Sequence, residues 1–313
     1  MGSGDRARRF ARALATGQYQ LGTGLVADRT VHDLIGEIAA LLSQARIPDP
    51  RREATDIVAA VLDVPRLWPA VHRQELISQN SQSLALRASA HRAMGAPFAY
   101  SVGRAAFRHL NLEVDDRVLI PRQETEILVE AVLNHANTAG GLAVDIGTGS
   151  GAIALSLASE ARFEQVVGTD ISTGALAIAR ANASRVAPLL NSRVEFRHGS
   201  FLAPVAELRA RVVVSNPPYV ATAEAFSLPA SVRDWEPPVA LFSGGDGMVA
   251  TERIIRDAAC VLEPFDLLAL EVDSRRAPLA ARLAADTTQY HHITILPDLT
   301  GRDRILLATR TDR

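Results

Sequence analysis

The stretch Val144-Asp145-Ile146-Gly147-Thr148-Gly149-Ser150-Gly151 decides the fold class of this chain. It follows an expected strand over 142–146 and opens an expected helix over 152–159. Glycines let the backbone approach a ligand closely, and a helix N-terminus adds unpaired N–H donors. A second expected strand, 165–169, ends at Asp170, whose carboxylate can accept hydrogen bonds from both hydroxyls of a ribose. This order of strand, loop, helix, strand and acid predicts an α/β fold that binds a nucleoside-containing ligand.

Two cofactors compete for such a loop. Dinucleotides usually require G-x-G-x-x-G to accommodate a pyrophosphate. Here the glycines follow G-x-G-x-G, and Asp145 directly precedes them. S-adenosylmethionine (SAM) has no phosphate, carries an amino-acid end and a sulfonium, and suits a carboxylate at that position. The loop therefore favours SAM.

From about Arg122 the chain alternates expected helices with expected strands. The helices are 124–136, 152–159, 173–183 and 247–262, and the strands are 142–146, 165–169, 194–196, 212–215 and 267–272. Such alternation predicts a parallel sheet with helices on both faces. The last two segments, 293–296 and 304–309, are expected to pair antiparallel.

The residues before this region have a different pattern. Residues 1–30 carry a net positive charge and contain several glycines, which predicts a loosely ordered arm. The alternative is an arm that binds a partner or is swapped between the two chains of a dimer. Residues 31–94 repeat apolar positions at helical spacing and predict a small helical domain. Residues 95–121 alternate apolar and polar positions, which predicts a β-hairpin linker to the domain at 122–313.

Composition excludes several classes of protein. The 313 residues are 48% hydrophobic with a net charge of −2, so no generally basic nucleic-acid surface is expected. One cysteine, Cys260, excludes a disulfide framework and a Cys-rich zinc site, and no other metal-ligand cluster is visible. The chain contains no lysine, which excludes a Schiff-base or P-loop mechanism. No membrane-spanning or secretory segment is evident, so the cytoplasm is the expected location.

A second motif, Ser215-Asn216-Pro217-Pro218-Tyr219, directly follows an expected strand. The carboxyl edge of a parallel sheet is where ligands bind. The Asn216 side-chain oxygen and the Pro217 carbonyl can accept hydrogen bonds from one planar NH2 group, and Tyr219 can cover its face or the methyl cation. An amide or aromatic amine nitrogen is weakly nucleophilic, so orientation and electrostatics must supply most of the rate. The motif predicts an enzyme that methylates nitrogen.

Together the two motifs resemble SAM-dependent N-methyltransferases with an Asn-Pro-Pro-Tyr/Phe signature. A closer resemblance is to the release-factor glutamine N5-methyltransferases, whose "VLIPRPETE" signature is similar to Val118-Leu119-Ile120-Pro121-Arg122-Gln123-Glu124-Thr125-Glu126. Further matches are Ala93–Tyr100, Glu236–Leu241, Gly245–Gly247 and Asp298–Arg304. The similarity extends from about Val31 to Leu307.

This resemblance implies a helical N-terminal domain, a hairpin linker and a seven-stranded Rossmann-like methyltransferase domain. Its implied acceptor is the glutamine of a release factor's Gly-Gly-Gln segment, held by the residues from Asn216 to Tyr219. Its implied cofactor contacts are Asp145, Gly147, Thr148, Gly149, Gly151, Asp170, Ile171, Ser200, Phe201 and Asn216.

The chain departs from the family pattern at three places. Gln123 replaces a proline of the signature, and Ser200 stands where an aspartate commonly faces the adenine. Asp273 follows an expected strand in Glu271-Val272-Asp273-Ser274-Arg275-Arg276, where the family has "E-I-G-x-x-Q". A new carboxylate there would suit a cationic guanidinium, with Glu236 or Glu271 assisting. The alternative is neutral drift, with Asp273 paired to Arg275 or Arg276.

Several hypotheses about the acceptor follow. The first is the release-factor glutamine, and the second is a free amino acid or small molecule, arginine above all, in a specialised pathway. Methylation of an exocyclic amine in DNA or RNA is disfavoured because a flipped base needs a basic channel. A SAM-binding protein without catalysis is disfavoured by the intact Asn-Pro-Pro-Tyr motif. The sequence leaves the oligomeric state open, a homodimer included.

Overall fold

The computed structural model describes residues 29–136 and 138–312, and these divide into two compact units. The helical unit consists of residues 29–103 together with Pro229–Trp235. The sheet unit consists of Arg104–Leu228 together with residues 236–312. The expected N-terminal arm, 1–30, lies outside the described residues except for Arg29 and Thr30.

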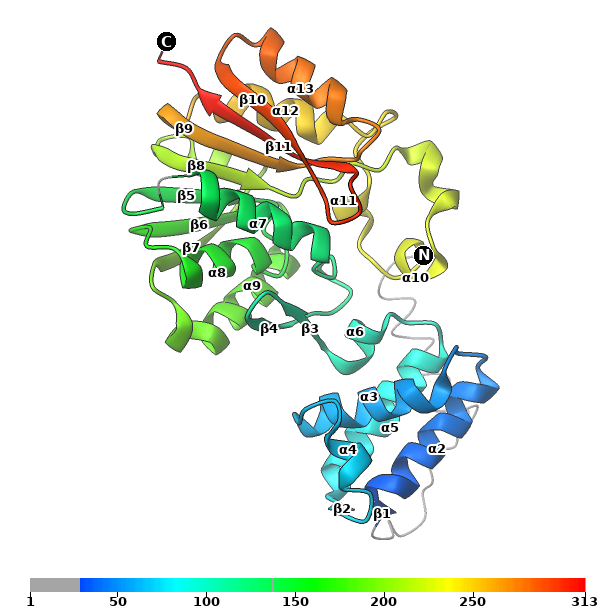
Figure 1. Ribbon diagram of the computed structural model, residues 1–313. Helices are drawn as coiled ribbons and strands as arrows, with labels where there is room; N and C mark the ends of the chain where they lie inside the picture. The colour runs from blue at the N-terminus through cyan, green and yellow to red at the C-terminus, as the bar shows by residue number, and fades with distance from the viewer. Residues whose placement is uncertain (1–28, 137, 313) are drawn as a thin grey trace. The chain divides into compact units, whose positions relative to one another are not determined.

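The helical unit is built around one apolar cluster. Its elements are β1 (Arg29–Thr30), α2 (Val31–Gln44), α3 (Pro50–Leu62), α4 (Trp68–Val71), β2 (Leu76–Ile77), α5 (Gln79–Ala93), α6 (Phe98–Val102) and α10 (Ala230–Arg233) (Figure 1). Thr30 caps α2, since its hydroxyl accepts a hydrogen bond from the Asp33 N–H at 3.2 Å. Leu34, Ile38 and Leu42, spaced four residues apart, bury one face of this helix.

The linker segment differs from expectation. Phe98, Tyr100 and Val102 alternate, as in a strand, but the structure forms the short helix α6 there, preceded by Pro97 and ended by Gly103 at φ +73°. Phe98 and Val102 also have i, i+4 spacing, and both pack against the core of the helical unit. The hairpin is therefore confined to β3 (Arg104–Phe107) and β4 (Leu110–Glu113).

The sheet unit contains a seven-stranded sheet in the order β10-β11-β9-β8-β5-β6-β7 (Figure 1). Its strands are β5 (Leu142–Ile146), β6 (Gln165–Asp170), β7 (Arg193–His198), β8 (Ala210–Ser215), β9 (Leu262–Glu271), β10 (Tyr290–Pro297) and β11 (Asp303–Arg310). The five strands from β5 to β9 pair parallel. Strand β11 pairs antiparallel with both β9 and β10, as expected for the C-terminal pair. The expected α/β fold is confirmed.

Helices cover both faces of this sheet (Figure 1). The helices are α7 (Gln123–His135), α8 (Ala152–Glu160), α9 (Thr173–Val186), α11 (Pro238–Leu241), α12 (Val249–Ala258) and α13 (Ala277–Asp286), with 3-10 turns at Ala187–Leu189, Ala203–Val205 and Thr222–Ser227. Residues of α7 and α8 form one apolar core with the sheet, and residues of α12 and α13 form the other. The sequence pattern above does not predict α13.

The strand order reverses between β5 and β8. From β5 the chain builds outward through β6 and β7, then returns to place β8 on the other side of β5. Loops that leave the carboxyl ends of β5 and β8 diverge at such a switch point and leave a crevice for a ligand. Both motifs of the sequence, at Gly147 and at Asn216, begin at this crevice.

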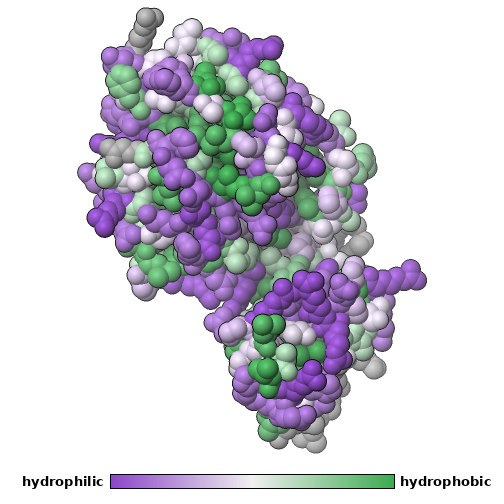
Figure 2. Space-filling model, viewed as in Figure 1, coloured by the Kyte–Doolittle hydropathy of each residue, from purple (hydrophilic) through white to green (hydrophobic). Residues whose placement is uncertain are grey.

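Figure 2 shows one face of the molecule coloured by hydropathy. The face in Figure 2 is largely hydrophilic, with smaller groups of apolar atoms. In the helical unit the exposed apolar side chains include Leu67, Val71 and Leu76. None of the described helices is long and apolar enough to cross a membrane.

Candidate active site

The glycine loop wraps the carboxyl end of β5. Gly147 and Gly149 have φ angles of +70° and +55°, which glycine adopts without strain. The N–H groups of Gly147 and Thr148 both donate to the Thr169 carbonyl, at 2.8 and 2.9 Å, which ties the loop to β6. A Cβ atom at Gly147 would meet nothing within 4 Å, so the backbone itself is open to a ligand.

Asp145 supports this loop from beneath. Its side chain is fully buried, and Oδ2 accepts hydrogen bonds from the Thr148 hydroxyl at 2.7 Å and from the Ala154 N–H at 3.1 Å. Burial raises the pKa of this carboxyl to about 7. Asp145 does not line the cavity described below, although a cofactor contact was expected there. Its position within β5, one residue before the strand ends, turns the side chain into the protein.

Asp170 ends β6 and faces the crevice. Its Oδ2 accepts from the Gly149 N–H at 2.9 Å, and its Oδ1 accepts from the Ser172 N–H at 2.8 Å. A carboxylate can accept about four hydrogen bonds, so these backbone contacts leave capacity for ribose hydroxyl groups. Burial raises the pKa of Asp170, and the backbone N–H donors oppose this shift.

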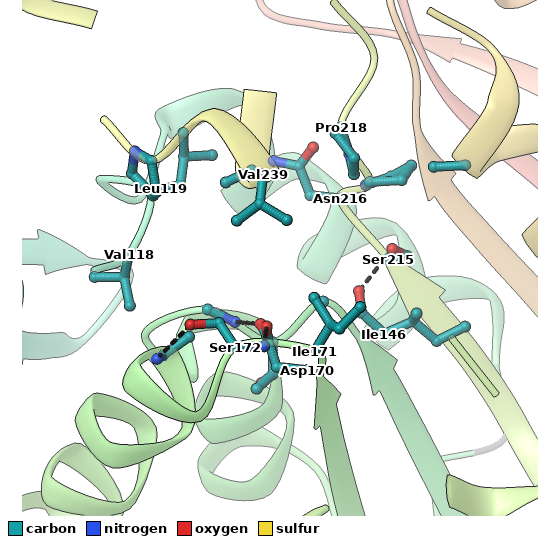
Figure 3. Close-up of a pocket in the computed structure, with 18 of the residues that line it drawn as sticks. Val118, Leu119, Ile146, Asp170, Ile171, Ser172, Ser215, Asn216, Pro218 and Val239 are labelled. Atoms are coloured by element: carbon teal, nitrogen blue, oxygen red, sulfur yellow. Dashed lines mark hydrogen bonds between the residues drawn. The ribbon is translucent and has the colours of Figure 1, made fainter. Parts of the chain in front are cut away.

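A cavity of about 360 Å³ lies between these loops, large enough for a small-molecule ligand. In Figure 3, Asp170, Ile171 and Ser172 lie on one side, and Leu119, Val239 and Asn216 on the opposite side. The expected site residues that line it are Gly147, Thr148, Gly149, Asp170, Ile171, Ser200, Phe201, Asn216, Pro217 and Pro218. The expected site residues outside its lining are Asp145, Gly151, Tyr219, Glu236, Glu271 and Asp273.

Gly151 has a structural position instead. It precedes α8 with φ +83°, and a Cβ atom there would lie 3.1 Å from Leu155 Cδ1. Because Gly151 has no side chain, Leu155 can pack closely against the backbone at the start of α8.

The Asn-Pro-Pro-Tyr turn leaves β8 at the crevice. Ser215 anchors it, since its buried hydroxyl donates to the Ile146 carbonyl at 2.7 Å and joins the ends of β8 and β5 (Figure 3). Asn216 lines the cavity, and its Nδ2 donates to Thr125 Oγ1 at 3.0 Å. Tyr219 turns away, and its hydroxyl donates to Glu271 Oε1 at 3.2 Å.

The three carboxylates expected at the acceptor have other partners. Glu236 is 1% exposed, forms an ion pair with Arg122, and accepts a 3.4 Å hydrogen bond from the Ile120 N–H. Glu271 is equally buried at the end of β9 and accepts from Thr125 and Tyr219.

Asp273 belongs to a local cluster with two arginines. It accepts hydrogen bonds from the Arg275 N–H and Nε, both at 3.0 Å, and lies 3.3 Å from Arg276 Nη1. Glu224 pairs with the same two arginines at 2.8 and 3.0 Å. The tight turn before α13 brings these charges together, so two acidic and two basic groups neutralise each other.

Two further segments of the cavity wall contain none of the site residues expected to line it, although the family resemblance implies that the segment with Glu124 and Glu126 borders the cofactor. The signature segment contributes Arg117, Val118, Leu119, Pro121, Arg122 and Thr125, and the segment after Glu236 contributes Pro237, Val239, Ala240, Phe242, Ser243 and Gly244. Val118 and Ile120 alternate like a strand, but residues 117–122 form an irregular loop. Both segments overlap stretches that resemble the family, and the prolines at 121 and 237 are the signal that they are loops.

The described residues contain no group of three or more His, Cys, Asp or Glu side chains that could hold a metal ion. The site therefore consists of the open backbone at Gly147, the Asp170 carboxylate, apolar cavity walls and the polar turn at Asn216.

Known protein families match both units of this chain. Residues 33–103 match the PrmC N-terminal domain, and residues 123–231 match the methyltransferase small domain. The release factor glutamine methyltransferase of Moorella thermoacetica is 39% identical over 286 residues, with 90% of this chain and 99% of that protein covered. The chain belongs to the release factor glutamine methyltransferase family. A relative of the same name from Gloeobacter violaceus is 36% identical over 270 residues, with 85% of this chain and 93% of the relative covered.

Among solved structures, one similar chain is the release-factor-specific protein-(glutamine-N5) methyltransferase from Alicyclobacillus acidocaldarius. It is 26% identical with a TM-score of 0.38, and the match covers 64% of this chain and 99% of that chain. The family resemblance inferred from the motifs is confirmed by the full-length relatives.

Family membership makes this chain a SAM-dependent methyltransferase, and the cavity fits that cofactor. Gly147 and Gly149 leave room for its amino-acid end, and Asp170 presents free lone pairs for ribose hydroxyls. Ile171 and Phe201 also line the cavity, and their apolar side chains would suit the adenine.

Proposed function

We propose that this enzyme methylates the side-chain amide nitrogen of a glutamine in a peptide-chain release factor. The observation that carries the proposal is the match over almost the whole length of relatives with that name, helical and sheet units included. The activity belongs to translation, so we expect the enzyme to act in the cytoplasm.

The chemistry of the cavity supports an amide acceptor. When bound, SAM would supply an electrophilic methyl group: the acceptor nitrogen would form a bond to the methyl carbon as the carbon–sulfur bond breaks, with S-adenosylhomocysteine leaving and the nitrogen losing a proton. Asn216 offers a side-chain oxygen and Pro217 a backbone carbonyl, and together these would accept both protons of one NH2 group. Holding that group fixes the direction of its nitrogen lone pair, and orientation contributes much of the rate for a weak nucleophile.

A guanidinium acceptor has less support in the site. Asp273, the carboxylate that prompted this alternative, contacts Arg275 and Arg276 and does not line the cavity. Glu236 and Glu271 are buried in contacts with other side chains. The cavity lining includes Asp170, which the cofactor's ribose would use.

The test is mass spectrometry of parallel reactions with SAM. One contains release factor, one a release factor with that glutamine replaced by asparagine, and one free arginine. We expect the mass of one CH2 to be gained only on the glutamine of the intact factor. Asn216→Ala should lower kcat by roughly 10²- to 10³-fold, the usual loss for a group that stabilises the transition state. Methylation of arginine with an unmodified release factor would overturn the proposal.

A further inference from the structure

A buried carboxylate outside the cavity is linked by hydrogen bonds to both ends of the Asn-Pro-Pro-Tyr turn, directly to Tyr219 and through Thr125 to Asn216. Glu271 is 1% exposed, and its Oε1 accepts from the Tyr219 hydroxyl at 3.2 Å. Its Oε2 accepts from the Thr125 hydroxyl at 2.6 Å, and Thr125 in turn accepts from Asn216 Nδ2 at 3.0 Å. Three elements far apart in the sequence, α7, β9 and the turn after β8, meet in this chain of hydrogen bonds.

The direction of these hydrogen bonds determines how the Asn216 amide is oriented. A threonine hydroxyl has one proton, and an ionised carboxylate can only accept. Because Thr125 gives its proton to Glu271, its lone pair must receive a proton from Asn216, which only the NH2 end can supply. The two ends of an amide have nearly the same shape, so packing alone would not choose between them.

The oxygen of Asn216 is thereby kept as a free acceptor. No described residue donates a hydrogen bond to Oδ1, and the side chain lines the cavity. With the amide reversed, an NH2 group would face the NH2 of the acceptor, and two donors repel.

The surroundings of Glu271 act on its charge in both directions. Burial raises the pKa of Glu271, and the Thr125 hydroxyl, the charge of Arg304 and the Tyr219 hydroxyl oppose that rise, whereas Glu124 adds to it. Arg304 comes from β11 and also donates to the Val272 carbonyl at 3.3 Å. The carboxylate therefore has one cation and two hydroxyl donors around it.

We propose that Glu271 and Thr125 are positioning residues that hold Asn216 with its oxygen toward the acceptor nitrogen, while Tyr219 fixes the far end of the same turn to the same carboxylate. This inference rests on the proposed function, since it concerns how the acceptor amide is held. Neither residue is assigned contact with the reacting atoms.

The experiment compares Thr125→Val with Thr125→Ser in steady-state assays on full-length release factor. Valine keeps the branched shape and removes the hydroxyl, and serine keeps the hydroxyl. We expect Thr125→Val to lower kcat by roughly 10- to 100-fold, the cost of a misplaced reacting group. Thr125→Ser should retain most of the activity. The dissociation constant of S-adenosylhomocysteine should change far less than kcat in both variants, because this chain of hydrogen bonds orients the group that holds the acceptor.

A double-mutant cycle separates positioning from general structural damage. Glu271→Gln should also lower kcat. The double variant Thr125→Val/Glu271→Gln should have a kcat only slightly below that of either single variant, because both substitutions interrupt the same chain of hydrogen bonds from Glu271 through Thr125 to Asn216. Additive losses, or equal activity of the valine and serine variants, would overturn the inference. Thr55→Val is the control, since its hydroxyl donates only to the Arg51 carbonyl within α3.

The two proposals fail in different ways. A wild-type enzyme that leaves release factor unmodified contradicts the proposed function, and the variants are then assayed on the acceptor that is methylated. An active wild type with a fully active Thr125→Val variant contradicts only the positioning role of Thr125 and Glu271.

Discussion

At the scale of single residues, Asp145 couples the stability of the sheet unit to pH. Its pKa is about 7 in the folded protein, because burial disfavours the charged form, whereas an aspartate in an unfolded chain has a pKa near 4. Between these values the folded protein binds a proton that the unfolded chain has lost. The free energy of unfolding contributed by Asp145 therefore falls as the pH rises from 4 to 7.

Asp145→Asn should remove this dependence. Between pH 5 and pH 7.5, the free energy of unfolding of the wild type should fall by roughly 2 to 3 kcal/mol relative to that of the variant. Urea denaturation at the two pH values measures this difference. The comparison with the variant cancels the other titrating groups. A difference in unfolding free energy that is the same at both pH values would contradict a raised pKa for Asp145.

At the scale of elements, the glycine loop depends on close contact between β6 and the residues above it. A Cβ atom at Gly168 would lie 2.7 Å from Phe196 Cδ1 and 2.7 Å from Thr148 Oγ1. Thr148 is the residue whose hydroxyl holds the loop to Asp145. Any side chain at position 168 must therefore displace the anchor of the loop or the packing of β7.

Gly168→Ala should destabilise the protein by roughly 1 to 3 kcal/mol, the range for overpacking a core, and weaken binding of S-adenosylhomocysteine. Thermal unfolding and calorimetric titration measure the two effects. Gly36→Ala in α2 is the matched control, since a Cβ atom there meets nothing within 4 Å and alanine favours a helix. Equal binding by Gly168→Ala and wild type would show that the loop does not depend on this contact.

At the scale of the whole molecule, each unit has its own apolar core. Leu34, Ile38 and Ile57 belong to the cluster of the helical unit, and the clusters on the two faces of the sheet contain none of its residues. The cavity is lined entirely by residues of the sheet unit. Ligand binding therefore acts directly on one unit.

Hydrogen exchange with and without S-adenosylhomocysteine tests this division. At a ligand concentration of about 100 times the dissociation constant, S-adenosylhomocysteine stabilises the state that binds it by about 2.7 kcal/mol. We expect slower exchange in residues 146–151, 170–172 and 199–201, and unchanged exchange in α2, α3 and α5. An equal slowing in the helical unit would show that the two units open together.

The order of strands and helices, the glycine loop and the Asn-Pro-Pro-Tyr turn were predictable, because each depends on residues that are neighbours in the sequence. Periodicity predicts β5 at its observed bounds, and the positions of Asp170 and Asn216 at strand ends predict that both reach the carboxyl edge. The same reasoning from neighbouring residues wrongly predicted a strand at Phe98–Val102, where the apolar spacing fits both a strand and a helix, and the structure forms a helix.

The sequence by itself therefore determined the fold class, the methyl donor and the family, whereas only the tertiary structure decided which carboxylates face the ligand. Asp145 and Asp170 both come from strands beside the loop, yet one is buried beneath it and the other lines the cavity. Glu271 meets Thr125, 146 positions away in the chain. A side chain's direction depends on strand register and on what packs against it, and those contacts come from residues that the sequence keeps far apart.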